Sequence, residues 1–372
     1  MTLLAVREFF DIPVLIGDTL VSYKASGKRR FPTQPPNKLL DSASTLHYGY
    51  LPGNTYRKVY IISDNFAIGW VGDMWPAANL LEDIFSIFAG RAVTPEAWEK
   101  FITSQHPDAR TNMVLAGWII ESGKRLAFRW RSKFPSNLEK DIAKGACFSD
   151  GTGADFARRT LGEPVAYTTT ATEGRHKATL CALDGISQLI AYELLDGSNL
   201  LDLFGLCYEL IVFDGNRFSY IDDINYLHYH YTWHTDRPNQ MEGGIVRFRT
   251  HYRNFDDYAC CTISNHVYDP HIDGFFVIKP VFGEKSQPDW APTNRIRQGF
   301  DAEYFCNFVF VEASDGMNMY SPFVVSKGSP DLPIEYIDQG NETYVKMKEG
   351  HDFILQYYLS HRAQVIEIEY RP

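Results

Sequence analysis

The chain has 372 residues and a formal net charge of -10; 45% of its residues are hydrophobic, 15% aromatic and 22% charged. This length exceeds that of one ordinary domain and the composition is globular, so we expect two domains. The acidic balance argues against a nucleic-acid partner, because backbone phosphates need a concentrated basic surface. No apolar stretch approaches the ~18 residues that cross a bilayer, and no basic segment precedes an apolar block at the N-terminus. We therefore expect a cytoplasmic protein without a membrane partner.

Residues 1–222 alternate between β-patterned runs and runs with helical periodicity. Pro, Gly, Ser and Asn interrupt residues 24–55, which are therefore predicted as a long loop. The other predicted elements are, in chain order, a hairpin over 2–23 with its turn around Asp11 and Pro13, two strands over 57–71 around Ser63-Asp64-Asn65, helices over 78–88 and 94–105, strands over 113–120, 124–130 and 143–148, a helix over 176–195 and a strand over 205–213.

From about residue 223 the chain changes to aromatic, strand-like runs separated by Pro, Asp, Gly and Asn. The 22 tyrosines and 25 phenylalanines of the chain favour strands. We therefore divide the chain into a first domain over 1–222 and a β-rich accessory domain over 223–372. The clearest strand-like runs of the second domain cover 243–252, 274–282, 304–313 and 353–359.

Thr2 directly follows Met1, and a small second residue is compatible with removal of that methionine. A threonine hydroxyl is a weak nucleophile, but an N-terminal threonine carries its own base. Its α-amino group titrates near ~7.7–8.0 and is partly neutral at cellular pH. Thr2 could thus supply both the nucleophile and the base of an acyl-transfer site.

Several spaced positions resemble the proteasome β subunits and the bacterial HslV peptidase. Asp18 follows Thr2 by sixteen residues, as the structural acid of that family follows its nucleophile. Lys58 opens the run KVYIISDNFAIGWVGD, and Gly72 follows it by fourteen residues, again the family interval. The run DGTGADFA over 150–157 is similar to the Gly-Ser-Gly-x-x-Tyr-Ala turn that opens the family's next helix.

The resemblance covers residues 2–222 and implies an α+β fold, a four-layer αββα sandwich of N-terminal-nucleophile (Ntn) hydrolase type, followed by the β-rich domain. It does not cover the second domain. The site residues that it implies are Thr2, Asp18, Lys58, Gly72, Thr152 and Asp202.

Each of these residues has a physical task in the implied site. Lys58, held by Asp18, would place positive charge beside the hydroxyl and amine of Thr2 and favour their deprotonated forms. The Gly72 backbone N–H would donate to the oxyanion of a tetrahedral intermediate. Thr152 would orient the N-terminal amine by hydrogen bonding.

The chain also departs from the family pattern. Asp202, the further acid, lies three residues before Gly205 instead of four, and Phe204 stands in place of the family's serine. The loop over 24–55 is longer than the family's. Trp75 adds bulk just after the oxyanion glycine, where small residues are usual.

We accordingly predict a threonine-type Ntn amidohydrolase, a peptidase acting on a peptide or amide substrate through Thr2 after loss of Met1, with no cofactor and no metal. The resemblance further implies a homo-oligomer, a ring or stacked assembly, and leaves any unfoldase partner open. The alternative is a non-catalytic scaffold or binding protein of the same fold, with Met1 retained or Trp75 filling the cleft. A third class is carbohydrate or peptide binding by the aromatic C-terminal domain.

His228, His230 and His234 have even spacing, so an extended strand would present all three on one face, as a metal site needs. Such a pattern more often reflects packed or surface histidines than a metal site. The same holds for the His and Asp residues over 266–273. The six cysteines lack metal-type spacing, so buried free thiols are expected.

Overall fold

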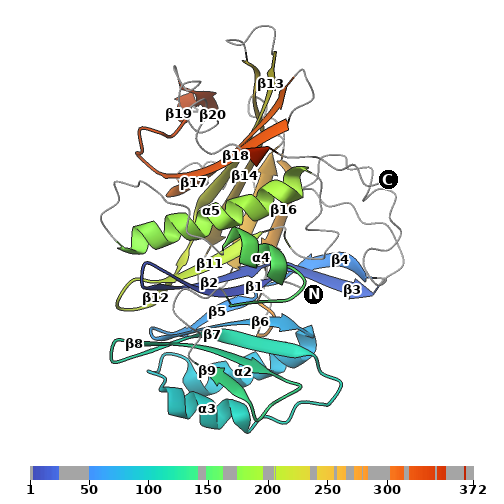
Figure 1. The fold of residues 1–372 in the computed structure, drawn as a ribbon, viewed down its shortest axis with the longest axis vertical. Coiled ribbons are helices and arrows are strands. Elements are labelled where there is room, and N and C mark those ends of the chain that lie inside the picture. Colours follow the sequence, from blue (N-terminus) through green and yellow to red (C-terminus); the bar gives the residue numbers. More distant parts are fainter. Residues whose placement is uncertain are drawn as a thin grey trace.

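The computed structural model of the chain describes residues 3–24, 50–140, 148–161, 174–195, 205, 207–234, 241–254, 258–264, 272–278, 280–283, 302–313, 318–339, 342–348 and 364–365. Within these ranges the chain combines mostly antiparallel sheets with a small number of helices (Figure 1). The predicted α+β class is thus confirmed.

The first sheet has five strands in the order β10-β1-β2-β11-β12, and every neighbouring pair is antiparallel. The predicted N-terminal hairpin is present, but its turn lies at Phe10 and Asp11, both with positive φ. Pro13 is not in the turn; it pairs with Glu8 inside the second strand. The strands are β1 (Leu4–Phe9), β2 (Ile12–Asp18), β10 (Phe148–Asp150), β11 (Tyr208–Phe213) and β12 (Phe218–Ile221).

The second sheet also has five antiparallel strands, in chain order. Its strands are β5 (Val59–Ser63), β6 (Phe66–Gly72), β7 (Met113–Glu121), β8 (Lys124–Arg131) and β9 (Leu138–Lys140). Helices α2 (Met74–Phe88) and α3 (Pro95–Thr103) pack on it around Phe66, Trp98 and Phe128. The predicted start of α3 is confirmed, because the Thr94 side chain accepts the Ala97 N–H at 3.2 Å.

The two sheets pack against each other through apolar side chains from both, among them Leu4, Leu15, Val59 and Ala67. Trp118 adds a polar tie between the sheets, since its indole N–H donates to the Val14 carbonyl at 3.0 Å. Helices α4 (Ala154–Thr160) and α5 (Gly174–Leu195) cover the other face of the first sheet, so each sheet has helices on the side away from its partner (Figure 1).

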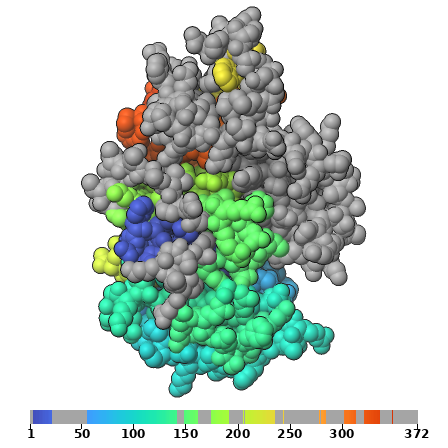
Figure 2. Space-filling view, viewed as in Figure 1, coloured from blue at the N-terminus to red at the C-terminus, as the bar shows by residue number. Residues whose placement is uncertain are grey.

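The C-terminal strands form a seven-stranded sheet in the order β16-β15-β14-β13-β17-β18-β21, in which β13 and β17 are parallel. Tyr304, Cys306 and Phe308 join the same apolar cluster as α5, so this helix is packed between the first sheet and the C-terminal sheet. In Figure 2 the second sheet with its helices lies at one end of the molecule, and the coloured parts of β13, β17 and β18 lie toward the other. The strands are β13 (Ile224–Trp233), β14 (Met241–Asn254), β15 (Tyr258–Ser264), β16 (Ile272–Ile278), β17 (Tyr304–Ala313), β18 (Asn318–Ser326) and β21 (Gln364–Val365), and β19 (Ile334–Gln339) pairs separately with β20 (Glu342–Met347).

The prediction of a loop over 24–55 is wrong for residues 50–55, because these form strand β4 (Tyr50–Thr55), which pairs with β3 (Leu20–Lys24). Pro52 lies inside that strand, which is possible because a two-stranded ladder leaves edges where a residue without N–H is tolerated. The helix predicted from residue 78 begins earlier, at Met74, with Pro76 in its first turn. Strands β9 and β12 were not predicted. The segments 25–49, 141–147 and 349–363 lie outside the described residues, and with them most of the predicted strands at 143–148 and 353–359.

Candidate active site

Asp18 ends β2, the middle strand of the first sheet, and binds backbone groups at the end of the sheet where β1 starts. Its side chain is fully buried. Oδ1 accepts the backbone N–H of Leu3 at 2.8 Å, and Oδ2 accepts the backbone N–H of Gly205 at 3.0 Å. A carboxylate that accepts two backbone donors fixes both segments relative to itself. The residue after Thr2 and the glycine before β11 are therefore held on one side chain.

Lys58 reaches the same carboxylate from the second sheet. Its Nζ lies 2.6 Å from Asp18 Oδ1 and also donates to the Leu20 carbonyl, and its side chain is 1% exposed. Burial lowers the pKa of the Lys58 ammonium, and the Asp18 carboxylate acts in the opposite direction. The geometry thus places a buried lysine, whose proton is held less tightly than usual, beside the acid that holds Leu3.

Gly72 is the last residue of β6, and Lys58 directly precedes β5. Both therefore lie at the open end of the β5–β6 hairpin, opposite its turn. The Trp70 N–H donates to the Lys58 carbonyl at 3.0 Å, and Gly72 follows two residues later. Gly72 has φ +102°, and a Cβ there would collide with the Asn112 carbonyl oxygen. Glycine is required on both counts. The structure therefore brings Gly72 and Lys58 to the same end of one hairpin, directly before helix α2.

Thr152 lies in the turn between β10 and α4. Because Asp150 pairs with Leu4 in antiparallel register, the chain after Asp150 runs toward the N-terminal side of β1. The Thr152 hydroxyl is buried and has no hydrogen-bond partner among the residues that the structure describes. A buried hydroxyl of this kind is one that a further donor or acceptor would satisfy.

Thr2 and Asp202, the remaining residues predicted for the site, lie outside the described residues. Thr2 is bonded to Leu3, whose N–H is held by Asp18. Asp202 lies three residues before Gly205, whose N–H is held by the same carboxylate. The described part of the site therefore consists of Asp18 and Lys58 in direct contact, with Gly72 at the end of the hairpin where Lys58 lies and Thr152 in the turn after β10.

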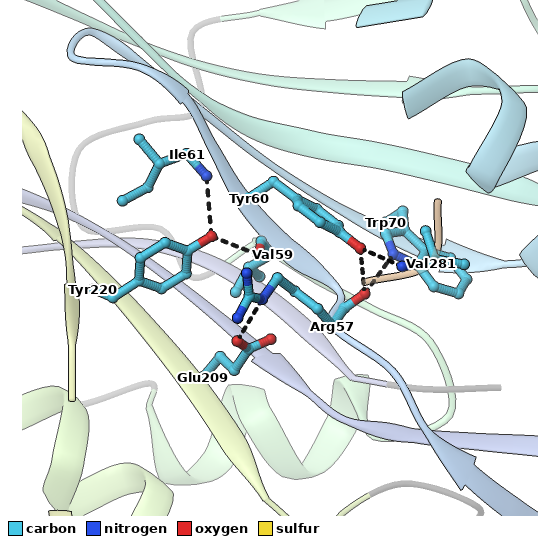
Figure 3. Close-up of polar contacts among 8 residues, drawn as sticks. All are labelled: Arg57, Val59, Tyr60, Ile61, Trp70, Glu209, Tyr220 and Val281. Atoms are coloured by element: carbon cyan, nitrogen blue, oxygen red, sulfur yellow. Dashed lines mark hydrogen bonds and ion pairs between the residues drawn. The ribbon is translucent and has the colours of Figure 1, made fainter. Parts of the chain in front are cut away.

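A second buried ion pair adjoins this site and was not predicted from the sequence (Figure 3). Arg57 Nε lies 3.0 Å from Glu209 Oε1, and both side chains are almost fully buried. The guanidinium also lies over the Tyr220 ring, 5.3 Å from its centroid. A single acid inside the apolar strand YELIVF, and an arginine next to Lys58, are the sequence signals that could have indicated it.

The carbonyl of Arg57 anchors two aromatic side chains of the same hairpin (Figure 3). The Tyr60 hydroxyl donates to it at 3.0 Å and the Trp70 indole N–H at 3.1 Å. Burial raises the pKa of Tyr60, so its hydroxyl stays protonated as a donor. These bonds fix the two rings beside the backbone that carries Lys58.

The predicted histidine group does not form a metal cluster in the described part of the chain. His228 and His230 lie two residues apart in β13, which keeps a regular register with β17, and the bulge opposite them belongs to β14. His230 Nε2 lies 3.6 Å from Glu312 Oε2, and its ring packs on Phe310. Across the described residues, no three His, Cys, Asp or Glu side chains gather as ligands. Of the cysteines, three have described side chains and are buried free thiols as predicted: Cys181, Cys207 and Cys306.

Trp75 does not fill the site. Its side chain is 68% exposed at the start of α2. It lines a surface cavity of about 370 Å³ together with Asp83, His106 and Trp130, among others. The bulk that the sequence places after Gly72 is therefore directed largely to solvent.

Comparison of the chain with models of known protein families and with curated proteins found no match. None of the helices in the described ranges has the length and apolarity that a bilayer crossing requires.

Proposed function

We propose that the chain is a threonine-type Ntn amidohydrolase, a peptidase related to the proteasome β subunits and HslV, in which Thr2 is the nucleophile after Met1 has been removed. The observation that carries the proposal is the buried Asp18–Lys58 pair, because its carboxylate also holds the N–H of Leu3, the residue bonded to Thr2. Burying the Lys58 ammonium and the Asp18 carboxylate removes both charges from water, a cost that stability alone does not explain.

The fold is part of the same proposal. Two antiparallel five-stranded sheets packed face to face, with α4 and α5 on one outer side and α2 and α3 on the other, support a four-layer αββα sandwich of Ntn type. This arrangement covers the residues over which the sequence resembles the family.

In the proposed reaction the Thr2 hydroxyl attacks the carbonyl carbon of an amide, and the Thr2 α-amine takes the hydroxyl proton. The Gly72 N–H donates to the oxyanion that forms. Collapse of the tetrahedral intermediate breaks the C–N bond, and the leaving amine takes the proton from the α-amine. Water then hydrolyses the ester on Thr2. Lys58 supplies positive charge near the hydroxyl. The Thr152 hydroxyl, which has no hydrogen-bond partner in the described part of the chain, would bind the α-amine.

We propose a cytoplasmic homo-oligomer, in keeping with the family, acting on a peptide or amide substrate. The face of α5 that points away from the first sheet is not available for such self-association, because the C-terminal sheet packs on it. An assembly would have to use other surfaces of the first domain. A non-catalytic scaffold is the competing proposal. It predicts that Met1 is retained or that a bulky group such as Trp75 fills the cleft, and the Trp75 side chain is 68% exposed.

Mass spectrometry of the intact protein from cells, followed by labelling with a peptide epoxyketone or a β-lactone, tests the proposal. We expect Met1 to be absent and one label to attach to Thr2. Thr2→Ser should keep the label and Thr2→Ala should lose it. Retention of Met1 in all molecules, or labelling that survives Thr2→Ala, would contradict the proposed mechanism.

A further inference from the structure

The surface cavity of about 370 Å³ beside Trp75 lies between helix α2 and the loop that follows α3. One wall is the side of α2 on which Trp75, Asn79 and Asp83 recur at every fourth residue, a spacing that aligns side chains along a helix. The loop over 105–111 forms the opposite wall, and Trp130 of β8 forms the inner end. Both helices lie on the outer side of the second sheet (Figure 1). We call this cavity the Trp75 cavity.

Hydrogen bonds hold the walls of the Trp75 cavity in place. The Asn112 N–H donates to Asp73 Oδ2 at 2.7 Å, and the Asp73 N–H donates to the Asn112 carbonyl at 3.0 Å, so the end of the loop is tied to the start of α2. The Trp130 indole N–H donates to the Pro135 carbonyl at 2.9 Å, which fixes the ring at the inner end. The cavity is therefore formed before any ligand arrives, as is usual for small-molecule sites.

Two indole rings line the cavity. Trp130 is fully buried, whereas Trp75 is 68% exposed and is the most exposed large apolar residue in the part of the chain that the structure describes. Tryptophan is highly buried on average, so a ring left open at the mouth of a cavity is an unusual use of it. Indole is also the ring that attracts a cation most strongly. The two rings thus suit a ligand that is flat, positively charged or both.

The charged groups of the cavity are acidic. Asp83 comes from α2 and Asp108 from the loop, and among the residues that line the cavity, all of which are described, there is no lysine or arginine. Arg110 Nε lies 3.8 Å from Asp108 Oδ1 while both side chains are largely exposed, and a pair of this kind is weak enough for an incoming cation to replace it. The remaining ionisable group of the lining is His106. A cation in the cavity would therefore meet carboxylates on two facing walls and indole rings beside them.

We propose that the Trp75 cavity binds a guanidinium group. A guanidinium is planar, so it stacks on an indole, and its five donors spread in a fixed fork that reaches acceptors on both walls at once; a compact ammonium does neither as well. The cavity volume falls within the ~300–1,000 Å³ of small-molecule sites. The lining includes neither Asp18 nor Lys58, so this binding is separate from the proposed reaction and does not depend on it.

A titration with small ligands tests the charge and the shape that the cavity selects. The protein is labelled with 5-fluorotryptophan, and fluorine NMR follows the Trp75 signal, which is assigned by its loss in Trp75→Phe. At about pH 8, where histidine is neutral, n-butylguanidinium should shift this signal and bind at least about tenfold more tightly than n-butylurea, its uncharged counterpart of the same shape. n-Butylammonium should bind more weakly than the guanidinium. Equal binding of n-butylguanidinium and n-butylurea, or no binding of either, overturns the proposal.

The carboxylates are tested by substitutions that leave the fold intact, because both side chains lie at the surface. Asp83→Asn and Asp108→Asn should each weaken n-butylguanidinium binding about threefold, and the double variant at least about tenfold. Glu82→Gln is the matched control, since Glu82 is the exposed neighbour of Asp83 on α2 and does not line the cavity. If Glu82→Gln weakens binding as much as Asp83→Asn does, the cation is held by general surface charge and the proposal is wrong.

A peptide arm then identifies where the guanidinium comes from. Acetylated and amidated Ala-Arg-Ala is compared with the same peptide carrying citrulline, which is uncharged, in a Thr2→Ala background in which the proposed reaction cannot cleave either peptide. Binding of the arginine peptide at least as tightly as n-butylguanidinium assigns the site to an arginine side chain of a peptide or protein. Binding of n-butylguanidinium with exclusion of the arginine peptide assigns it to a free small molecule. Equal binding of the arginine and citrulline peptides refutes the guanidinium site, whatever the outcome of labelling at Thr2.

Discussion

Replacing Lys58 by methionine removes one half of a fully buried ion pair while keeping much of the side-chain volume. The loss has two parts in the structure. The charge-assisted bond to Asp18 is worth about 1.5–3 kcal/mol, and the buried Leu20 carbonyl left without its donor costs about 1–3 kcal/mol. Asp18 keeps the backbone donors of Leu3 and Gly205, which limits the loss of stability. We therefore expect Lys58→Met to lower the free energy of unfolding by about 3–5 kcal/mol.

The measurement is urea unfolding at neutral pH, followed by tryptophan fluorescence. Lys140→Met is the matched control, because Lys140 makes an ion pair with Glu99 in which both side chains are substantially exposed. Such a pair contributes about 0–1 kcal/mol. If Lys58→Met and Lys140→Met change the stability equally, the buried pair does not hold the two sheets as argued above.

Three further outcomes follow from the geometry. Gly72→Ala should destabilise by about 2–4 kcal/mol in urea unfolding, because its φ is left-handed and the added Cβ meets the Asn112 carbonyl; an unchanged midpoint would refute this. Burial raises the pKa of Cys306 from 9.0 to about 12, so the unfolded state loses its thiol proton first as pH rises. The stability of the wild type relative to Cys306→Ala should therefore fall by about 1.4 kcal/mol between about pH 8 and pH 10, and a flat difference would contradict the shift. Thr152→Val should slow labelling of Thr2 while changing stability by less than about 1 kcal/mol, since its hydroxyl has no described partner; unchanged labelling would remove Thr152 from the site.

Local sequence patterns predicted those parts of the fold that local physics decides. The N-terminal hairpin, the capped helix at Pro95 and the long helix ending at Leu195 follow from turn residues, caps and periodicity. Spacing within a resemblance predicted the contact of Asp18 with Lys58, forty residues apart. That contact could be predicted because the resemblance already gave the order of the strands whose ends carry the two residues.

The rest depends on contacts between distant segments, which periodicity does not encode. Strand β4 contains a proline and a glycine and pairs only because β3 lies beside it. The Arg57–Glu209 pair joins residues 152 positions apart. Val281 finds the Tyr60 hydroxyl across 221 positions, from a region that the resemblance does not cover. In each case the tertiary neighbour decides the local structure, as expected where propensity is weak.

The two buried ion pairs together fix how the hairpin sits on the first sheet. Arg57 and Lys58 are consecutive, and their acids come from adjacent strands, because Asp18 pairs with Tyr208 and Glu209 with Gly17 in the β2–β11 ladder. A shift of the hairpin by one residue would separate both cations from their acids and leave buried charges unpaired, at a cost of several kcal/mol each. Apolar residues of the same size would give comparable stability but would allow such a shift. The pairs therefore specify register, and this register sets the position of the hairpin's open end, where Gly72 lies, relative to the N-terminal strand.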